Sequence, residues 1–143
     1  MRNKTVLFIC TGNAGRSQIA QALTERMNPP GVTAVSAGVA PWPDLHPVAR
    51  RLLTERGFDL RGKRPKHVST FADAALDWVV TIGDRARDET PPFRCKPVRE
   101  HWDIADPADA DGTGREDEAF RSTIDDIESR LPDLLKRIGS AEQ

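Results

Sequence analysis

The sequence predicts one α/β domain, a four-stranded parallel sheet flanked by helices on both faces. Short apolar runs rich in strand-forming residues alternate with amphipathic segments, which is the pattern of a parallel sheet joined by helical crossovers. The chain has 143 residues, a length that fits one hydrophobic core. No repeat, low-complexity tract or linker divides it, so the domain is expected to cover residues 1–143.

The N-terminal half predicts two strand and helix pairs. Residues 5–9 form a short continuous apolar run typical of a buried central strand, and the run ends at Cys10. Residues 16–27 follow as a helix with apolar side chains on one face, ended by an Asn-Pro-Pro sequence. Residues 32–35 predict the second strand, and a helix over residues 47–56 is stopped by a glycine.

The C-terminal half continues the alternation of helices and strands. A short helical stretch is expected over residues 71–75, and residues 78–82 form another buried-strand run. Residues 83–96 are polar and contain prolines, which predicts a long loop over one end of the sheet. Residues 97–102 can supply the fourth strand.

A long amphipathic helix is expected near the end of the sequence. Apolar residues recur at helical spacing between Phe120 and Ile138. Pro132 lies inside this pattern, and because proline cannot donate the helical hydrogen bond, a kink or a break is expected there. The acidic segment over residues 103–118 predicts a solvated loop and the N-terminus of the helix.

Composition and charge exclude several classes of function. The net charge of −1 gives no overall field that would draw the chain to nucleic acid or to an anionic membrane. The apolar runs are too short for a signal peptide or a membrane span, so a cytoplasmic protein is expected. Cys10 and Cys95 are then expected to remain thiols. The histidines and cysteines show no zinc spacing, so neither a metal nor a bound cofactor is expected.

The segment between the first strand and the first helix is where a parallel sheet places its ligand. Its two glycines and its asparagine permit left-handed backbone conformations, so its amides can curl inward as an anion-binding nest at a helix N-terminus. The arginine of the segment adds a planar guanidinium that matches two oxygens of a phosphate-like ion. The candidate oxyanion-binding residues are Thr11, Gly12, Asn13, Ala14, Gly15 and Arg16.

Cys10 is the candidate nucleophile of this loop. The helix N-terminus, the inward amides and the guanidinium all favour a thiolate, and Ser17 can donate a hydrogen bond to the sulfur. A cysteine that ends a buried strand is also commonly an inert small hydrophobic residue. Packing alone requires neither Arg16 nor Ser17, so the complete pattern favours a catalytic loop. The Gly-Lys-Ser/Thr ending of a nucleotide-binding loop is absent.

The pattern resembles the low-molecular-weight protein tyrosine phosphatase superfamily and, within it, the arsenate reductases that share the phosphatase fold. The resemblance begins with Cys10 and Arg16, which enclose a five-residue gap and precede a serine. It implies a low-molecular-weight phosphatase-like fold over nearly the whole chain. The other landmarks, in the family's order, are Ser36-Ala37-Gly38, Val79-Val80-Thr81, His101-Trp102 and Asp106-Pro107-Ala108, followed by the terminal helix.

The resemblance also implies a role for Asp106 and favours the reductase branch. Asp106 falls on the Asp-Pro element that supplies the general acid in the phosphatases. Phosphatase members usually have tyrosine after this element, whereas this sequence has Ala108 there and no tyrosine at all. By its sequence alone, Asp106 could equally be a solvated turn residue.

The relay cysteines of the thioredoxin-coupled reductases are missing from this sequence. Their positions fall on Gly83 and Thr90, and Gly15 replaces a further loop cysteine that is common in the family. The Asn-Ala-Gly-Arg-Ser string is similar to actinobacterial reductases that use an external small thiol. Gln21 replaces a glutamate that supports a potassium site in some relatives, so bound potassium is not expected.

Three functions remain open. In an arsenate reductase, Cys10 attacks arsenate and a second thiol reduces the adduct, while phosphate or sulfate competes for the loop. The expected reductant is mycothiol or a glutathione-type thiol, with or without a glutaredoxin-like partner protein, and Cys95 is the internal alternative. In a protein tyrosine or arginine phosphatase, Asp106 protonates the leaving group and a cysteinyl-phosphate forms. The third function is non-catalytic oxyanion binding.

Two expectations concern the surroundings of the loop. Trp42 and Trp78 are interpreted as packing residues rather than as a substrate rim, because tryptophan is highly buried on average. The basic stretch over residues 61–66 is expected to be solvated rather than to touch the substrate.

Overall fold

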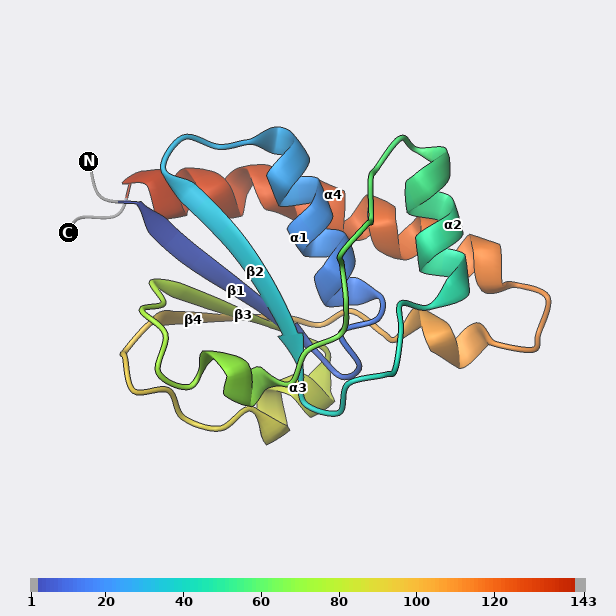
Figure 1. Ribbon diagram of the computed structural model, residues 1–143. Coiled ribbons are helices and arrows are strands. Elements are labelled where there is room, and N and C mark those ends of the chain that lie inside the picture. The colour runs from blue at the N-terminus through green and yellow to red at the C-terminus, as the bar shows by residue number, and fades with distance from the viewer. Residues whose placement is uncertain (1–2, 141–143) are drawn as a thin grey trace.

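The computed structural model describes residues 3–140 and shows one parallel sheet within them. Figure 1 shows the strands running side by side toward the lower right of the view. The predicted four-stranded parallel sheet is confirmed. The strands lie in the order β2 (Val32–Gly38), β1 (Lys4–Cys10), β3 (Trp78–Ile82) and β4 (Val98–Trp102).

Helices cover both faces of the sheet, as the alternation predicted. One face carries α1 (Arg16–Met27), α2 (Pro47–Glu55) and α4 (Glu116–Ser140), which appear above and to the right of the sheet in Figure 1. The other face carries the short helix α3 (Asp84–Glu89) and the 3-10 turn η1 (Val68–Phe71). A second 3-10 turn, η2 (Pro107–Ala110), lies between β4 and α4.

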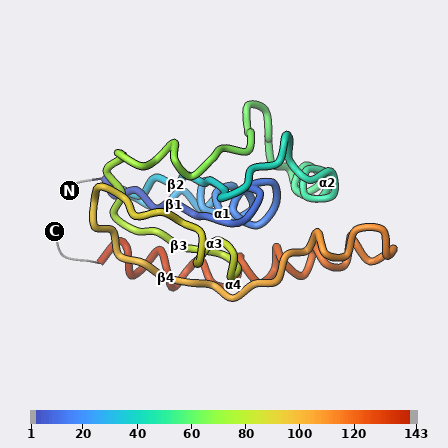
Figure 2. The backbone as a smooth tube through the Cα atoms, turned by 90° about the horizontal axis from the view of Figure 1, so that it is seen from below, coloured from blue at the N-terminus to red at the C-terminus, as the bar shows by residue number. Residues whose placement is uncertain are grey.

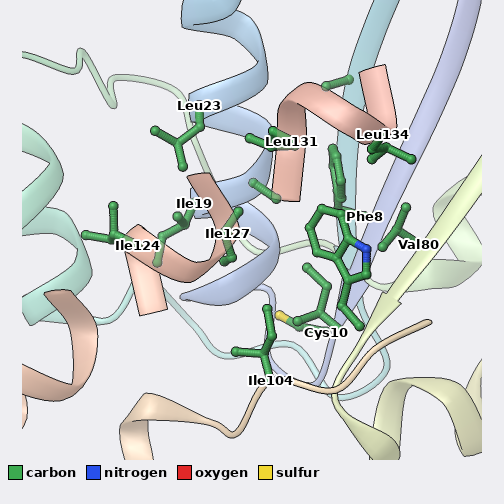
Figure 3. Close-up of a cluster of buried hydrophobic side chains, with 14 of the residues drawn as sticks. Phe8, Cys10, Ile19, Leu23, Val80, Ile104, Ile124, Ile127, Leu131 and Leu134 are labelled. Atoms are coloured by element: carbon green, nitrogen blue, oxygen red, sulfur yellow. The ribbon is translucent and has the colours of Figure 1, made fainter. Parts of the chain in front are cut away.

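Strand β1 is buried on both faces because it lies inside the sheet. Phe8 and Cys10 belong to the cluster beneath α1 and α4, and Figure 3 shows Cys10 beside Ile104. Leu7 and Ile9 point to the opposite face and join the cluster beneath α3. Because both faces of β1 are buried, the run over residues 5–9 is continuously apolar and does not alternate between apolar and polar residues.

The carboxyl end of β1 is the topological switch point of the sheet. The first crossover leads from β1 to β2 on one side of β1, and the second leads from β2 to β3 on the other side, so the strand order reverses at β1. Cys10 lies opposite Gly38 at this end. A crevice outside the strand ends at such a point is where open α/β sheets bind ligands.

The structure corrects three details of the predicted elements. Helix α3 lies within residues 83–96, which were expected to form only a loop. The turn η1 begins at Val68, ahead of the helical stretch expected over residues 71–75. Helix α4 runs through Pro132 without a break. Figure 2 shows α4 extending along the whole length of the fold.

Packing explains why α4 tolerates its proline. Pro132 is exposed, and its neighbour Leu131 is fully buried in the core. The apolar face of the helix packs in one cluster with α1, α2 and the sheet, so its burial offsets the one backbone hydrogen bond that proline cannot donate. None of the helices within residues 3–140 has the length and apolar character required to span a membrane.

Candidate active site

Four backbone carbonyls of the loop between β1 and α1 are turned outward. They accept hydrogen bonds from a segment that lies beside the loop, residues 39–46, which we call the bracing segment. The four bonds run from Val39 N to Cys10 O (3.2 Å), Ala40 N to Thr11 O (2.8 Å), Trp42 N to Gly12 O (3.0 Å) and His46 N to Ala14 O (2.9 Å). Because a trans peptide directs its N–H and C=O to opposite sides, this arrangement turns loop amides toward the centre.

Gly38 allows the loop to lie this close to β2. A Cβ at this position would come within 2.7 Å of Thr11 O and 2.8 Å of Asn13 N. Any larger residue would therefore displace the loop backbone. The close approach gives a physical reason for the glycine that ends the Ser36-Ala37-Gly38 landmark.

Asn13 shapes the bottom of the loop. It has φ of 50°, in the left-handed region, whereas Gly12 and Gly15, which were expected to permit such a conformation, do not have positive φ. The backbone N–H of Asn13 donates to Cys10 Sγ over 3.3 Å. A donor at this distance stabilises negative charge on the sulfur.

Ser17 provides a second contact to the sulfur. Its Oγ lies 2.9 Å from Cys10 Sγ and accepts a hydrogen bond of 2.7 Å from Asn13 Nδ2. Since Asn13 already supplies a donor to this hydroxyl oxygen, the hydroxyl hydrogen is available to the sulfur. Another acceptor near this hydroxyl, Ala37 O, is more distant at 3.4 Å. Cys10 itself is 2% exposed and lies at the base of the loop.

The Asn13 side chain is held by donors from outside the loop. Its Oδ1 accepts from Lys66 N (2.9 Å), Gln18 Nε2 (3.2 Å) and Lys66 Nζ (3.4 Å). Burial lowers the pKa of Lys66. The basic stretch over residues 61–66 was expected to be solvated. Its last residue, Lys66, is instead partly buried and donates hydrogen bonds to Asn13 of the loop.

Arg16 lies in the site with its guanidinium fixed. NH1 donates to Ile104 O over 2.8 Å, and NH2 donates to Thr11 Oγ1 over 3.4 Å. The side chain is 5% exposed. Gly83, with φ of 89°, makes room for it, because a Cβ there would lie 2.2 Å from NH1. The guanidinium thus stays beside the loop, where it can bind an oxyanion through two donors.

Asp106, in the segment after β4, also lines the pocket and lies beside Arg16. Its Oδ1 accepts from Ala108 N over 3.0 Å and caps η2, while its Oδ2 lies 3.4 Å from Arg16 NH2. The structure thereby brings Cys10, Arg16, Ser17 and Asp106 together. The pocket above the sulfur is lined by Cys10, Gly12, Ala14, Gly15, Arg16, Trp42, His46, Asp106, Ala108 and Phe120.

An aromatic wall beside the pocket was not predicted. The His46 ring lies 4.4 Å from the Phe120 ring and 5.4 Å from the Trp42 ring, measured between centroids. Trp42 was interpreted as a packing residue, yet it is 40% exposed and borders the pocket, whereas Trp78 is buried as expected. The His46-Pro47 pair predicts a helix cap, but no sequence signal connects it with Cys10.

Cys95 lies on the other side of the sheet from Cys10. It is partly buried and packs against the hydrophobic cluster that contains Phe93, whereas Cys10 belongs to the cluster beneath α1 and α4. The sheet therefore separates the two sulfurs in this conformation. Across residues 3–140, histidine, cysteine and carboxylate side chains form no group of three that could hold a metal ion.

The geometry supports nucleophilic chemistry on a tetrahedral oxyanion. Inward amides and Arg16 would bind the oxygens, Cys10 would face the central atom, and Asp106 would stand beside a departing oxygen. The sequence matches the family of low molecular weight phosphotyrosine protein phosphatases over residues 5–143. The chain belongs to this family.

The relatives with curated names within this phosphatase family include arsenate reductases. The arsenate reductase of Bacillus subtilis is 34% identical over 137 residues, which cover 95% of this chain and 98% of the relative. The glutaredoxin arsenate reductase of Synechocystis is 24% identical and covers 94% of this chain and 98% of the relative.

A solved structure agrees with these sequence relatives. The thioredoxin-dependent arsenate reductase of Corynebacterium glutamicum superposes with a TM-score of 0.76 at 30% identity. The match covers 99% of this chain and 64% of that protein, so this chain spans about two thirds of its length. The family and the fold implied by the sequence landmarks are thereby confirmed.

Proposed function

We propose that this protein is an arsenate reductase with Cys10 as its nucleophile. The observation that supports this most strongly is the position of Cys10 Sγ, which lies at the base of a loop in which four backbone carbonyls are bonded to the bracing segment. A tetrahedral oxyanion in this loop would meet backbone N–H groups and the Arg16 guanidinium directly above the sulfur. The named relatives reported above are arsenate reductases, which favours arsenate as the oxyanion.

The first step joins sulfur to arsenic. The Cys10 thiolate attacks the arsenic of arsenate, an S–As bond forms, and one As–O bond breaks. The departing oxygen takes up protons and leaves as water, with Asp106 as the proposed proton donor. Arg16 neutralises charge on the remaining oxygens. The product is a Cys10 adduct in which arsenic keeps its oxidation state of +5.

The second step requires a second thiol. Its thiolate attacks Cys10 Sγ, an S–S bond forms, and the S–As bond breaks with its electron pair left on arsenic. Arsenic is reduced from +5 to +3 and leaves as arsenite, while the two thiols are oxidised to a mixed disulfide. A further thiol then reduces this disulfide and restores Cys10.

We propose that the second thiol comes from outside the chain. The chain has two cysteines, and the sheet lies between them. At Gly83, where the resemblance places a relay cysteine, a side chain would collide with Arg16. Mycothiol or a glutathione-type thiol is the proposed donor, with a redoxin as the proposed partner protein. Because the reaction consumes reduced thiols, we propose that the protein works in the reducing cytoplasm.

A phosphatase is the second candidate function. The observation that favours it is the family membership, together with the position of Asp106, which lines the pocket with Cys10 and lies 3.4 Å from Arg16 NH2. Cys10 would then attack phosphorus, Asp106 would protonate the leaving oxygen, and water would hydrolyse the cysteinyl-phosphate.

A matched assay separates the two candidates. Wild type, Cys10→Ser and Cys95→Ser are each incubated with arsenate plus mycothiol or glutathione, with and without a glutaredoxin, and separately with an aryl phosphate. Arsenite formation that depends on the added thiol, vanishes in Cys10→Ser and persists in Cys95→Ser is the expected result. Turnover of the aryl phosphate alone would reject the reductase, and loss of arsenite formation in Cys95→Ser would reject the external thiol.

A further inference from the structure

Both ring nitrogens of His46 are engaged in the fold. His46 caps the N-terminus of α2, where its Nδ1 accepts a hydrogen bond of 3.1 Å from Val48 N. Because Nδ1 is the acceptor, the ring proton of the neutral imidazole lies on Nε2. Nε2 lies 2.9 Å and 3.0 Å from the two carboxylate oxygens of Asp111, to which it donates.

The two partners belong to different parts of the site. His46 ends the bracing segment, and its backbone N–H donates to Ala14 O in the oxyanion loop. Asp111 follows η2 and caps its C-terminal end, whereas Asp106 caps the N-terminal end. In Figure 1, η2 is the short orange helical turn that precedes α4. The turn is therefore held at both ends, through Asp106 to Arg16 and through Asp111 to His46.

We propose that His46 and Asp111 are positioning residues that hold Asp106 over the Cys10 sulfur. The inference rests on the proposed function, in which Asp106 gives a proton to the departing oxygen. Neither residue of the pair needs to touch the oxyanion for this role. The pair holds η2 at a fixed distance from the oxyanion loop, and Asp106 lies at the N-terminal end of η2.

Two observations separate this role from simple pocket lining. His46 borders the pocket, but with Nδ1 accepting and Nε2 bonded to Asp111 it has no N–H left for an oxyanion. Asp111 is 47% exposed, so its contact with His46 is not enforced by general burial of the turn. To make the contact, the exposed Asp111 side chain must lose conformational entropy. Packing of the turn alone does not require this loss.

The test compares three substitutions. Asp111→Ala removes the contact from the turn. His46→Asn removes it from the bracing segment but keeps a side-chain oxygen that can cap α2. Asp109→Ala is the matched control, because Asp109 is an exposed carboxylate of the same turn with no side-chain partner among residues 3–140. The first two variants are expected to lower kcat about tenfold and leave the dissociation constant of inorganic phosphate within about twofold of wild type.

Two further measurements decide between positioning and structure. Amide hydrogen exchange at Ala108, whose N–H donates to Asp106, should become faster in Asp111→Ala and stay unchanged in Asp109→Ala. In an Asp106→Ala background, Asp111→Ala should cause no further loss of kcat, because the acid that it positions is absent. Unchanged exchange at Ala108, or an equal loss of kcat with and without Asp106, would overturn the proposal.

The readouts also separate this proposal from the assignment of the reaction. kcat is measured with both arsenate plus thiol and an aryl phosphate, since the proposed acid serves either reaction. Failure of arsenite formation in the wild type would reject the reductase. Hydrogen exchange at Ala108 requires no turnover, so it tests the positioning pair in either case.

Discussion

Around Cys10, single residues act through backbone contacts more than through their own charge. Asn13 adopts the left-handed conformation that directs its N–H at the sulfur, and its side chain leaves the Ser17 hydroxyl hydrogen free for the same atom. Gly83 acts by having no side chain, since Arg16 occupies the space that a Cβ would need. The sequence shows which residue types form the loop, but these contacts depend on the fold.

Gly83→Ala tests the space beside Arg16. The new methyl group would displace the guanidinium from its contact with Ile104 O, so affinity for inorganic phosphate should fall about tenfold. The backbone at φ of 89° adds strain of about 1 kcal/mol. Isothermal titration with phosphate measures the affinity, and thermal unfolding measures the strain.

Gly62→Ala is the control for that substitution. Gly62 has φ of 80°, and a Cβ there meets nothing within 4 Å. It should lose similar stability and keep wild-type phosphate affinity. Equal affinity losses in the two variants would show that Gly83 acts through backbone strain and not through Arg16.

Two elements far apart in the sequence are joined by an ion pair. Glu100 of β4 accepts hydrogen bonds from Arg137 of α4 at 2.6 Å and 3.1 Å, and from Trp102 Nε1 at 2.8 Å. The hydrogen bond from Arg137 is the main reason that the pKa of Glu100 is lowered. The pair connects an edge strand with the last part of the long helix.

Glu100→Gln should make stability less dependent on pH. A carboxyl whose pKa is lower in the folded state stabilises the fold at pH above its unfolded value, about 4.3. This contribution is lost as pH falls through the folded value. At pH 7 the variant should therefore lose about 0.5–1 kcal/mol, and the difference from wild type should shrink below about pH 4.

Urea unfolding of wild type and Glu100→Gln from pH 3 to pH 7 measures this difference. Glu118→Gln is the control, because the Arg115 and Glu118 side chains are 77% and 73% exposed. It should match wild type throughout. A constant difference between Glu100→Gln and wild type across this range would contradict the linkage.

Elements were predictable where apolar patterning specifies them. Residues 78–82 and 16–27 were placed at their observed bounds because each contains a clear strand run or helical face. Helix α3 was missed because it buries only Ala86 and is otherwise charged. Its stabilising contacts are ion pairs within the helix, such as Arg85 with Glu89, which a propensity argument does not weigh.

At the scale of the whole molecule, the site combines segments that only the fold brings together. The oxyanion loop was predictable because its residues are consecutive and follow a strand. The bracing segment, the turn that carries Asp106 and the ring of Phe120 come from three later parts of the chain. Asp106 was identified through the family resemblance, whereas no local sequence signal connects His46 or Asp111 with Cys10. Their roles depend on long-range packing.

The most direct test of the account is the alkylation of Cys10 in the presence of oxyanions. Wild-type protein is treated with iodoacetamide at pH 7, with and without arsenate, phosphate or sulfate, and labelling of Cys10 and Cys95 is followed separately by peptide mass spectrometry. We expect rapid labelling of Cys10 that arsenate and phosphate suppress, with no effect on Cys95. Slow labelling of Cys10, or labelling that neither arsenate nor phosphate suppresses, would contradict the proposal that its sulfur lies beneath a bound oxyanion.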